Sequence, residues 1–279
     1  MSSAETADPD AFAVRLETDG PVVLPGRPFE LRPEEVALLS PRHSDGRAKN
    51  ISLGPGGDLR GATADPATRT ELVSLMSRYR AWTEALIRDK APRYAPGLEM
   101  GRTSLRTREV ADGAESPRKD DRRLHVDAFA SQPTGGRRIL RVFTNINPDG
   151  EARLWRVGEP FEVHARRWAG RLRGPLPGEA RLLRALRVTR ALRTDYDHLM
   201  LGLHDAAKQD EAYQREAPGR EAAFPAGASW VVFTDSTVHA ALRGRYMLEQ
   251  TFYLPLSVLA VPEASPARIL ERLTGRALA

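Results

Sequence analysis

The spacing of apolar positions divides the chain into helical and β-rich regions. Over residues 67–92 the apolar side chains recur every three or four positions, which is the spacing of one buried helix face. From residue 98 onward, polar and apolar residues alternate, as they do in half-buried strands. The apolar positions that predict the helix are Leu72, Leu75, Met76, Tyr79, Trp82 and Leu86.

The alternating pattern predicts strands over residues 97–110, 123–131 and 137–147. Two longer strands follow over 224–242 and 245–260, joined by a turn at Arg243-Gly244. Residues 158–222 between these groups are predicted to be helical. Residues 22–41 indicate a short strand and then a helix beginning near Pro33, and residues 50–62 a glycine-rich loop without the ending of a Walker motif.

This order of elements favours a mainly β fold with flanking helices, of the α+β class. Strands that leave the sheet region and return to it are typical of a double-stranded β-helix, the cupin-like jelly roll. We expect residues 1–20 to be a disordered lead-in. Residues 21–279 should then form one domain, with N-terminal helices and a helical insertion at about 158–222.

The composition narrows the chemistry that the chain can perform. With no cysteine among 279 residues, disulfides, thiolate nucleophiles, zinc fingers and iron–sulfur clusters are excluded. A metal site must use histidine and carboxylate ligands. The net charge of +5 comes mostly from arginine, which suits an anionic partner, although biased composition explains the arginines equally well. No nucleic-acid-binding motif is present.

No segment of the sequence resembles a targeting signal or a membrane span. The N-terminus MSSAETADPDAF lacks the basic and apolar parts of a secretory signal. The longest apolar run, FYLPLSVLAVP, is broken by proline and too short to cross a bilayer. We therefore expect a cytoplasmic protein, for which peripheral contact with the inner face of the membrane stays open.

The segment RRLHVDAF carries the clearest chemical signal. His125 and Asp127 lie two positions apart in a predicted strand, so their side chains point to the same face. Two histidines and one carboxylate form a common iron-binding triad. His239, in a late strand 112 residues beyond Asp127, is the favoured third ligand. The alternative is a core histidine hydrogen-bonded to a neighbouring aspartate. The other histidines are His43 in a loop and His164, His198 and His204 in predicted helices.

Four segments in the same order resemble the Kdo (3-deoxy-D-manno-oct-2-ulosonic acid) 3-hydroxylase family. They are RKDDRRLHVDAF, RRILRVFTNINP, the run from PAG through SWVVFTDSTVHAAL, and LEQTFYLP. The resemblance implies a jelly-roll dioxygenase with Fe(II) held by His125, Asp127 and His239. It also implies 2-oxoglutarate and O2 as co-substrates. The implied substrate is a Kdo sugar of lipopolysaccharide (Kdo-lipid A), hydroxylated at position 3 with release of succinate and CO2.

The distal carboxylate of 2-oxoglutarate calls for a cation, ideally an arginine. Arg245 opens the strand after His239, and Arg141 interrupts an apolar strand where an unpaired charge would be costly. Arg106 is a third choice, and Asn145 shares the predicted face of Arg141. A salt bridge from Arg141 to a core carboxylate such as Glu249 is the competing interpretation.

Two further functions remain open at this stage. One keeps the iron and 2-oxoglutarate but acts on another small anionic or macromolecular substrate. The other is a non-catalytic, cupin-like sugar-binding module in which His125 and Asp127 are core residues.

Overall fold

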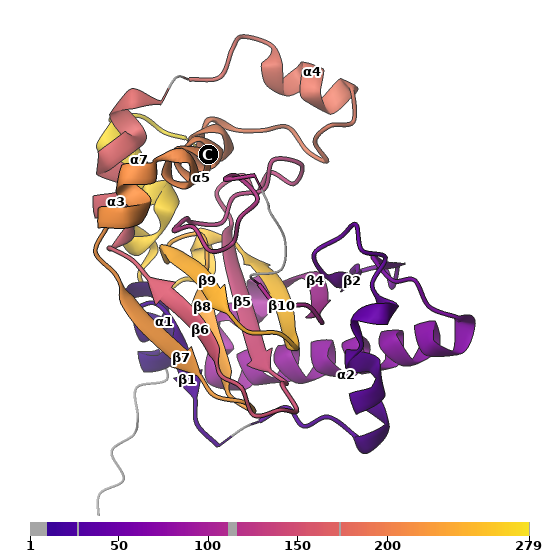
Figure 1. Cartoon of the computed structure of the whole chain (residues 1–279). Helices are drawn as coiled ribbons and strands as arrows, with labels where there is room; N and C mark the ends of the chain where they lie inside the picture. Colours follow the sequence, from indigo (N-terminus) through magenta and orange to yellow (C-terminus); the bar gives the residue numbers. More distant parts are fainter. Residues whose placement is uncertain (1–9, 27, 111–115, 173, 279) are drawn as a thin grey trace, which may run out of the picture.

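Two antiparallel sheets form the centre of the computed structural model, which describes residues 10–26, 28–110, 116–172 and 174–278 (Figure 1). The larger sheet has the order β1 (Val22–Leu24), β8 (Ser229–Phe233), β5 (Arg138–Asn145), β10 (Met247–Leu254), β4 (Glu99–Arg106), β2 (Ile51–Leu53) and β3 (Leu59–Arg60). The smaller sheet has the order β7 (Arg220–Phe224), β6 (Arg153–Val157) and β9 (His239–Arg243).

Aromatic side chains from both sheets pack against one another. Phe143 of β5 and Trp230 of β8 lie against Trp155 of β6, and the rings of Phe224 and Trp230 stack with centroids 3.9 Å apart. Facing sheets that share one core, with helices outside them, confirm the predicted double-stranded β-helix with flanking helices.

Helix α2 (Pro66–Lys90) covers the other face of the larger sheet (Figure 1). The carboxylate of Asp65 accepts hydrogen bonds from the first free N–H groups of the helix, and Pro66 occupies its first position. The predicted apolar face is buried, and the Tyr79 hydroxyl donates to the carbonyl oxygen of Val142 at 3.1 Å. With α2 on one side and the smaller sheet on the other, all eight residues of β10 are buried.

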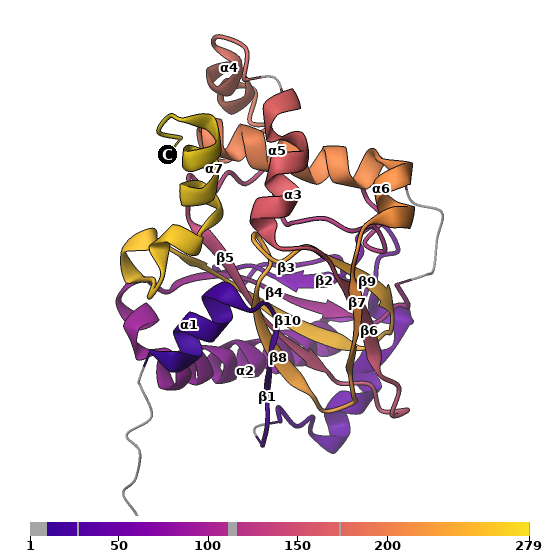
Figure 2. The ribbon, with the colours of Figure 1, turned by 90° about the vertical axis from the view of Figure 1, so that its left-hand side faces the viewer.

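Most of the remaining helices lie at one end of the two sheets (Figure 2). Helices α3 (Phe161–Trp168), α4 (Glu179–Ala185), α5 (Asp195–Gln209) and α6 (Glu211–Glu216) lie between β6 and β7, within the range predicted to be helical. Helices α3, α5 and α6, together with α7 (Pro266–Thr274), bury Leu124 and Val126, which flank His125. Short 3-10 helices span Pro33–Leu39, Pro41–His43, Pro92–Gly97, Ala169–Arg171, Leu256–Val258 and Pro262–Ala264.

The N-terminal region differs from the prediction. Residues 11–18, expected within a disordered lead-in, form helix α1 (Ala11–Thr18), while residues 1–9 lie outside the described part. The carboxylate of Glu17 in this helix is buried and accepts hydrogen bonds from the Tyr94 hydroxyl and the N–H groups of Ala260 and Val261. These contacts come from distant parts of the chain, so the local pattern does not show them.

Three β-region predictions also need correction. The glycine-rich stretch 50–62 contains the β2–β3 hairpin. The segment 123–131 is not a regular strand, because only His125 pairs, through an isolated bridge to His239. The stretch 224–242 contains two strands in different sheets, so His239 begins β9 and does not end a long strand. In the described residues, no helix combines the length and apolar character needed to cross a membrane.

Candidate metal centre

His125, Asp127 and His239 come together at the junction of the two sheets. Their potential ligand atoms all lie within 4.8 Å of one another, and the two imidazole centroids are 4.7 Å apart. The backbone N–H of each histidine donates to the carbonyl oxygen of the other, at 3.0 and 2.8 Å. The Asp127 N–H donates to the Thr234 carbonyl oxygen at 2.8 Å. Backbone pairing therefore fixes all three side chains in one place.

Both imidazoles present the same nitrogen to the site. Nδ1 of His125 lies 2.7 Å from the Arg123 carbonyl oxygen, and Nδ1 of His239 lies 2.8 Å from that of Thr237. A carbonyl oxygen only accepts, so each Nδ1 carries the proton and each Nε2 keeps its lone pair. This second hydrogen bond is the usual means of orienting a metal-binding histidine.

The electrostatics keep these groups in the protonation states that bind cations. Burial lowers the pKa of both His125 and His239, and for His125 the neighbouring His239 and Lys208 lower it further. Burial alone would raise the pKa of Asp127, but the nearby Arg141 guanidinium holds it below its usual range. Neutral imidazoles and an ionised carboxylate are the forms that a divalent metal requires.

A cavity of about 550 Å³ opens beside the three residues, and its lining is strongly basic. Nine lysines and arginines line it, against three carboxylates, so its field favours an anionic occupant. The basic residues are Lys49, Arg102, Arg106, Arg118, Lys119, Arg141, Arg153, Arg190 and Lys208.

Arg141 joins the metal-site carboxylate to a second one. Its guanidinium lies 3.1 Å from Asp127 and 3.1 Å from Glu249. The salt bridge to Glu249, the competing interpretation of Arg141, is therefore present. The two carboxylates neutralise the charge of Arg141, and Arg141 in turn helps to orient Asp127.

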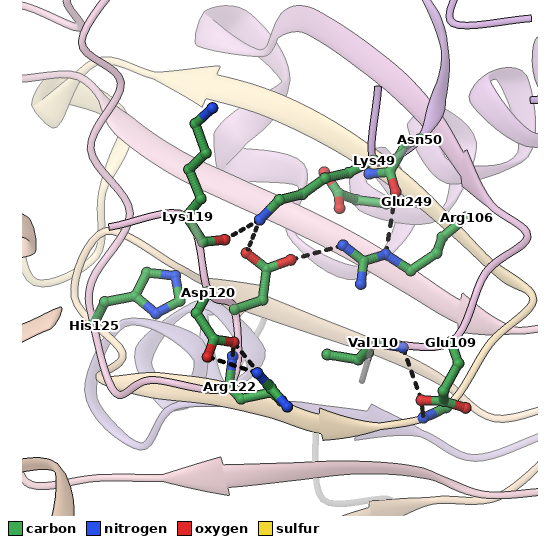
Figure 3. Close-up of polar contacts among 12 residues, drawn as sticks. Lys49, Asn50, Arg106, Glu109, Val110, Lys119, Asp120, Arg122, His125 and Glu249 are labelled. Atoms are coloured by element: carbon green, nitrogen blue, oxygen red, sulfur yellow. Dashed lines mark hydrogen bonds and ion pairs between the residues drawn. The ribbon is translucent and has the colours of Figure 1, made fainter. Parts of the chain in front are cut away.

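Arg106 also lines the cavity but shares its charge with neighbours. Lys49 and Arg106 converge on the carboxylate of Asp121, at 2.8 and 2.7 Å, near His125 (Figure 3). The Arg106 Nε also donates to the Asn50 side chain at 3.1 Å. Burial would raise the pKa of Asp121, yet the cations hold it well below its usual range.

Two of the four residues predicted for 2-oxoglutarate lie elsewhere. Arg245 falls in the turn before β10 and pairs with Asp149 at 2.8 Å, with both side chains exposed. Asn145 is buried at the end of β5, where its amide donates to the backbone carbonyls of Glu151 and Phe224. Neither residue lines the cavity. The structure places both outside the cavity, because one side chain faces solvent and the other caps backbone groups.

Arg153, which was not predicted as a site residue, lines the same cavity together with Trp155. Its side chain is 3% exposed and donates to the Gly244 carbonyl oxygen at 2.5 Å. Its Nε has no hydrogen-bond partner, and no described carboxylate lies within salt-bridge distance. Burial, with repulsion from Arg106, lowers its pKa to about 9. Alternation in RLWRV, which puts Arg153 and Trp155 on one face, was the available signal.

His204 of α5 is a further cavity residue. Its ring lies edge-on to His125 with centroids 5.3 Å apart, and its Nδ1 is 3.0 Å from Asp205. His198, six positions earlier, does not line the cavity, and His164 is buried among α3 and α6. The other histidines therefore do not join the cluster of three among the described residues.

Comparisons with known proteins agree with this geometry. The model of the 3-deoxy-D-manno-oct-2-ulosonic acid (Kdo) hydroxylase family matches residues 2–277. Three crystal structures of the Kdo hydroxylase KdoO, a non-heme Fe(II) alphaketoglutarate-dependent dioxygenase, are similar along the whole chain. The complex with alphaketoglutarate and Fe(III) has 41% identity, a TM-score of 0.93, and coverage of 100% of this chain and 94% of KdoO.

The other two KdoO structures give the same result. The apo structure has 41% identity and a TM-score of 0.93, and the cobalt(II) complex has 42% and 0.94; each match covers 99% of this chain and 93% of KdoO. No protein in the curated set matches significantly. On the family match over nearly its full length and on these structures, the chain belongs to the Kdo hydroxylase family.

Proposed function

We propose that this chain is an Fe(II)- and 2-oxoglutarate-dependent dioxygenase that hydroxylates position 3 of a Kdo sugar in lipopolysaccharide (Kdo-lipid A). One oxygen atom of O2 enters the sugar as a hydroxyl group, and the other enters succinate as 2-oxoglutarate loses CO2. The observation that carries the proposal is the convergence of His125, Asp127 and His239, with both Nε2 atoms turned toward the site. KdoO, at 41% identity, is a dioxygenase of this kind.

The three side chains fit a divalent metal. Two imidazole nitrogens and one carboxylate oxygen bind one face of an octahedral ion and leave positions for other ligands. Iron bound there would supply the redox chemistry that couples oxidation of 2-oxoglutarate by O2 to hydroxylation of a C–H bond. The protein's part is to fix the ligands and to place both substrates beside them.

Arg153 is the residue we assign to the distal carboxylate of 2-oxoglutarate. It is buried, has an unpartnered Nε, and lies in the same cavity as the metal ligands. A buried guanidinium without a counter-ion is costly, and a carboxylate would satisfy it with paired hydrogen bonds. Arg106 and Arg141 also line the cavity and remain candidates for polar contacts to the co-substrate.

The outer part of the cavity suits the acidic sugar. Arg102, Lys119 and Arg190 are exposed and line the cavity. Among described residues they have no ion-pair partner, so their charge is available to a carboxylate or phosphate. We infer that the substrate is presented on a glycolipid, which a protein in peripheral contact with the inner face of the cytoplasmic membrane would reach.

The test is a reaction of the purified protein with Fe(II), 2-oxoglutarate, O2 and Kdo-lipid A. We expect succinate and a lipid product heavier by one oxygen atom, and neither with the His239→Ala variant. Succinate without a modified lipid would move the assignment to another substrate. Absence of succinate with every acceptor, in a protein that binds the sugar, would support the non-catalytic module instead.

A further inference from the structure

The segment from residue 174 to 193, which we call the arm, exposes a cluster of large apolar side chains. Nine large apolar residues of the described chain are exposed, and five of them fall in the arm. Their exposed fractions run from 52% to 73%, whereas buried leucines elsewhere are below 10%. They are Leu176, Leu182, Leu186, Val188 and Leu192.

The arm is an ordered structure and not a loose loop. Helix α4 begins after Gly178, whose φ of 79° ends the preceding turn, and the Leu176 N–H donates to the Glu179 carboxylate at 3.0 Å. The helix closes through a left-handed Arg187, and the Val188 N–H donates to the Leu183 carbonyl oxygen at 2.9 Å. No residue of α4 is buried, and Figures 1 and 2 both show the helix standing away from the sheets. Leu182 therefore projects from a formed helix, and the other four exposed apolar residues lie in the segments that flank it.

Arginines alternate with these apolar residues. The sequence from 176 to 193 contains five arginines and one acid, Glu179, which gives it a net charge of +4. Leu182 and the C-cap Leu186 are four positions apart and share one face of α4, whereas Arg181 and Arg184 lie toward the opposite side, so the helix has an apolar side and a basic side. A basic and apolar surface of this kind matches a bilayer with anionic headgroups.

The arm is tied to the mouth of the cavity. The Arg190 N–H donates to the Ser131 carbonyl oxygen at 2.9 Å, and the Arg193 side chain donates to that of Ala130 at 2.8 Å. Ser131 and Arg190 both line the cavity. A surface that held the arm would therefore lie close to the entrance of the metal site.

We propose that the arm is a membrane-docking element, which inserts its leucines among the headgroups of an anionic phospholipid bilayer while its arginines pair with phosphates. The proposal rests on the proposed function in one respect, because an enzyme that acts on a lipid-linked sugar encounters its substrate at the bilayer surface. It adds the residues that hold the protein there. Peripheral binding combines apolar insertion with electrostatic attraction, so both kinds of side chain contribute.

The experiment is co-sedimentation of the full-length protein with vesicles of phosphatidylglycerol and phosphatidylethanolamine, compared with phosphatidylcholine alone. We expect binding to the anionic vesicles only, weakened by added salt. The Leu182→Asp/Leu186→Asp variant should lower the partition coefficient by about tenfold or more. Arg181→Gln/Arg184→Gln should lower it by about fivefold for each charge removed. The control Val36→Asp, at a residue 43% exposed and distant in sequence, should bind as the wild type does.

The variants must remain folded and able to bind ligands. Each should show the wild-type thermal stabilisation by Co(II) with 2-oxoglutarate, which reports on the metal site independently of lipid. If Co(II) with 2-oxoglutarate did not stabilise the wild type, the proposed function would be contradicted, but the vesicle measurement would still test the arm. The arm's assignment would be overturned if the leucine variant bound vesicles as well as the wild type, or if the wild type bound both lipid mixtures equally. It would also be overturned if the wild type formed a dimer that the leucine variant did not form, and bound no vesicles.

Discussion

The backbones of His125 and His239 exchange two hydrogen bonds, so the N–H and carbonyl groups of each residue pair with those of the other. The same two residues also present their Nε2 atoms to one point. The metal site is thus built on a β-bridge between segments that are distant in the sequence. The site forms only when the chain has closed into the two-sheet arrangement.

Removing one of these imidazoles should abolish metal binding with little effect on the fold. The variant His239→Ala keeps the backbone bridge, because the bridge uses only N–H and carbonyl groups. We expect Co(II) affinity to fall by more than about a hundredfold, beyond the usual effect of losing an outer-shell partner. Calorimetric titration measures it, with His43→Ala as the control. Wild-type affinity in His239→Ala would contradict the ligand assignment.

Replacing Arg153 should impair use of the co-substrate. Arg153→Met removes the buried cation that we assign to 2-oxoglutarate. Losing one partner of a buried charge pair costs about 2–5 kcal/mol, so the 2-oxoglutarate requirement should rise by roughly a hundredfold. Arg245→Ala, which removes an exposed arginine outside the cavity, is the matched control and should change nothing. A similar requirement in both variants would exclude Arg153.

Gly244 should be intolerant of a side chain because it lies against Arg153. Its φ is +119°, and a Cβ there would lie 2.9 Å from Cδ of Arg153. Gly227 also has a positive φ, of +83°, but has no neighbour within 4 Å. Both alanine variants should lose about 1–3 kcal/mol of unfolding free energy from backbone strain. Only Gly244→Ala should also raise the 2-oxoglutarate requirement. An equal rise in Gly227→Ala would mean that displacement of Arg153 does not cause it.

The buried ion pair between Arg138 and Asp235 should hold the turn that leads into β9. The two residues lie 2.8 Å apart, with side-chain exposures of 0% and 1%. Arg138→Met would leave the Asp235 charge buried and unpaired, at a cost of about 3–5 kcal/mol. Urea unfolding should show this loss, and Arg138→Met/Asp235→Leu should recover most of it. A double variant as unstable as the single one would mean that packing, and not the charge, is responsible.

His164 should make the protein sensitive to acid. Burial, assisted by the Arg167 charge, lowers its folded pKa to about 3 from an ordinary value of 6.5. Below pH 6.5 the unfolded chain takes up a proton that the folded chain does not, so stability falls as the pH decreases toward 3. At pH 5 the loss from this group is about 2 kcal/mol.

The measurement compares urea unfolding at pH 7 and pH 5 in the presence of a chelator. His164→Leu should reduce the difference between the two pH values by that amount, whatever its effect at pH 7. If His164→Leu keeps the full pH dependence, other groups cause it.

The three candidate metal ligands could be singled out from the sequence because their signals are local. The two-residue spacing of His125 and Asp127 defines a common face, and His239 is the one histidine in the late β region. Helix α2 was predictable for the same reason, since its apolar period repeats over many turns. The strand expected around His125 did not form, but the bridge to His239 gives the same orientation.

The cations could not be ranked in this way, because their roles depend on tertiary contacts. Arg245 lies outside the cavity because the chain has not yet entered β10 at that position; the next residue, Tyr246, has a φ of 58°. Asn145 lies outside the cavity because its amide donates to backbone carbonyls near the ends of neighbouring strands. Arg153 was missed because the short strand β6 is defined by its partners β7 and β9, not by its own five residues.

The buried guanidinium of Arg153, in the same cavity as the candidate metal ligands, has a thermodynamic consequence for the whole molecule. In the ligand-free protein this charge is kept from water with one hydrogen bond, to the Gly244 carbonyl oxygen. A protein with a dicarboxylate bound there would have to release the dicarboxylate before it unfolded. The ligand-free protein would thus unfold more readily, and the concentration of 2-oxoglutarate would set how well the protein resists heat and proteolysis.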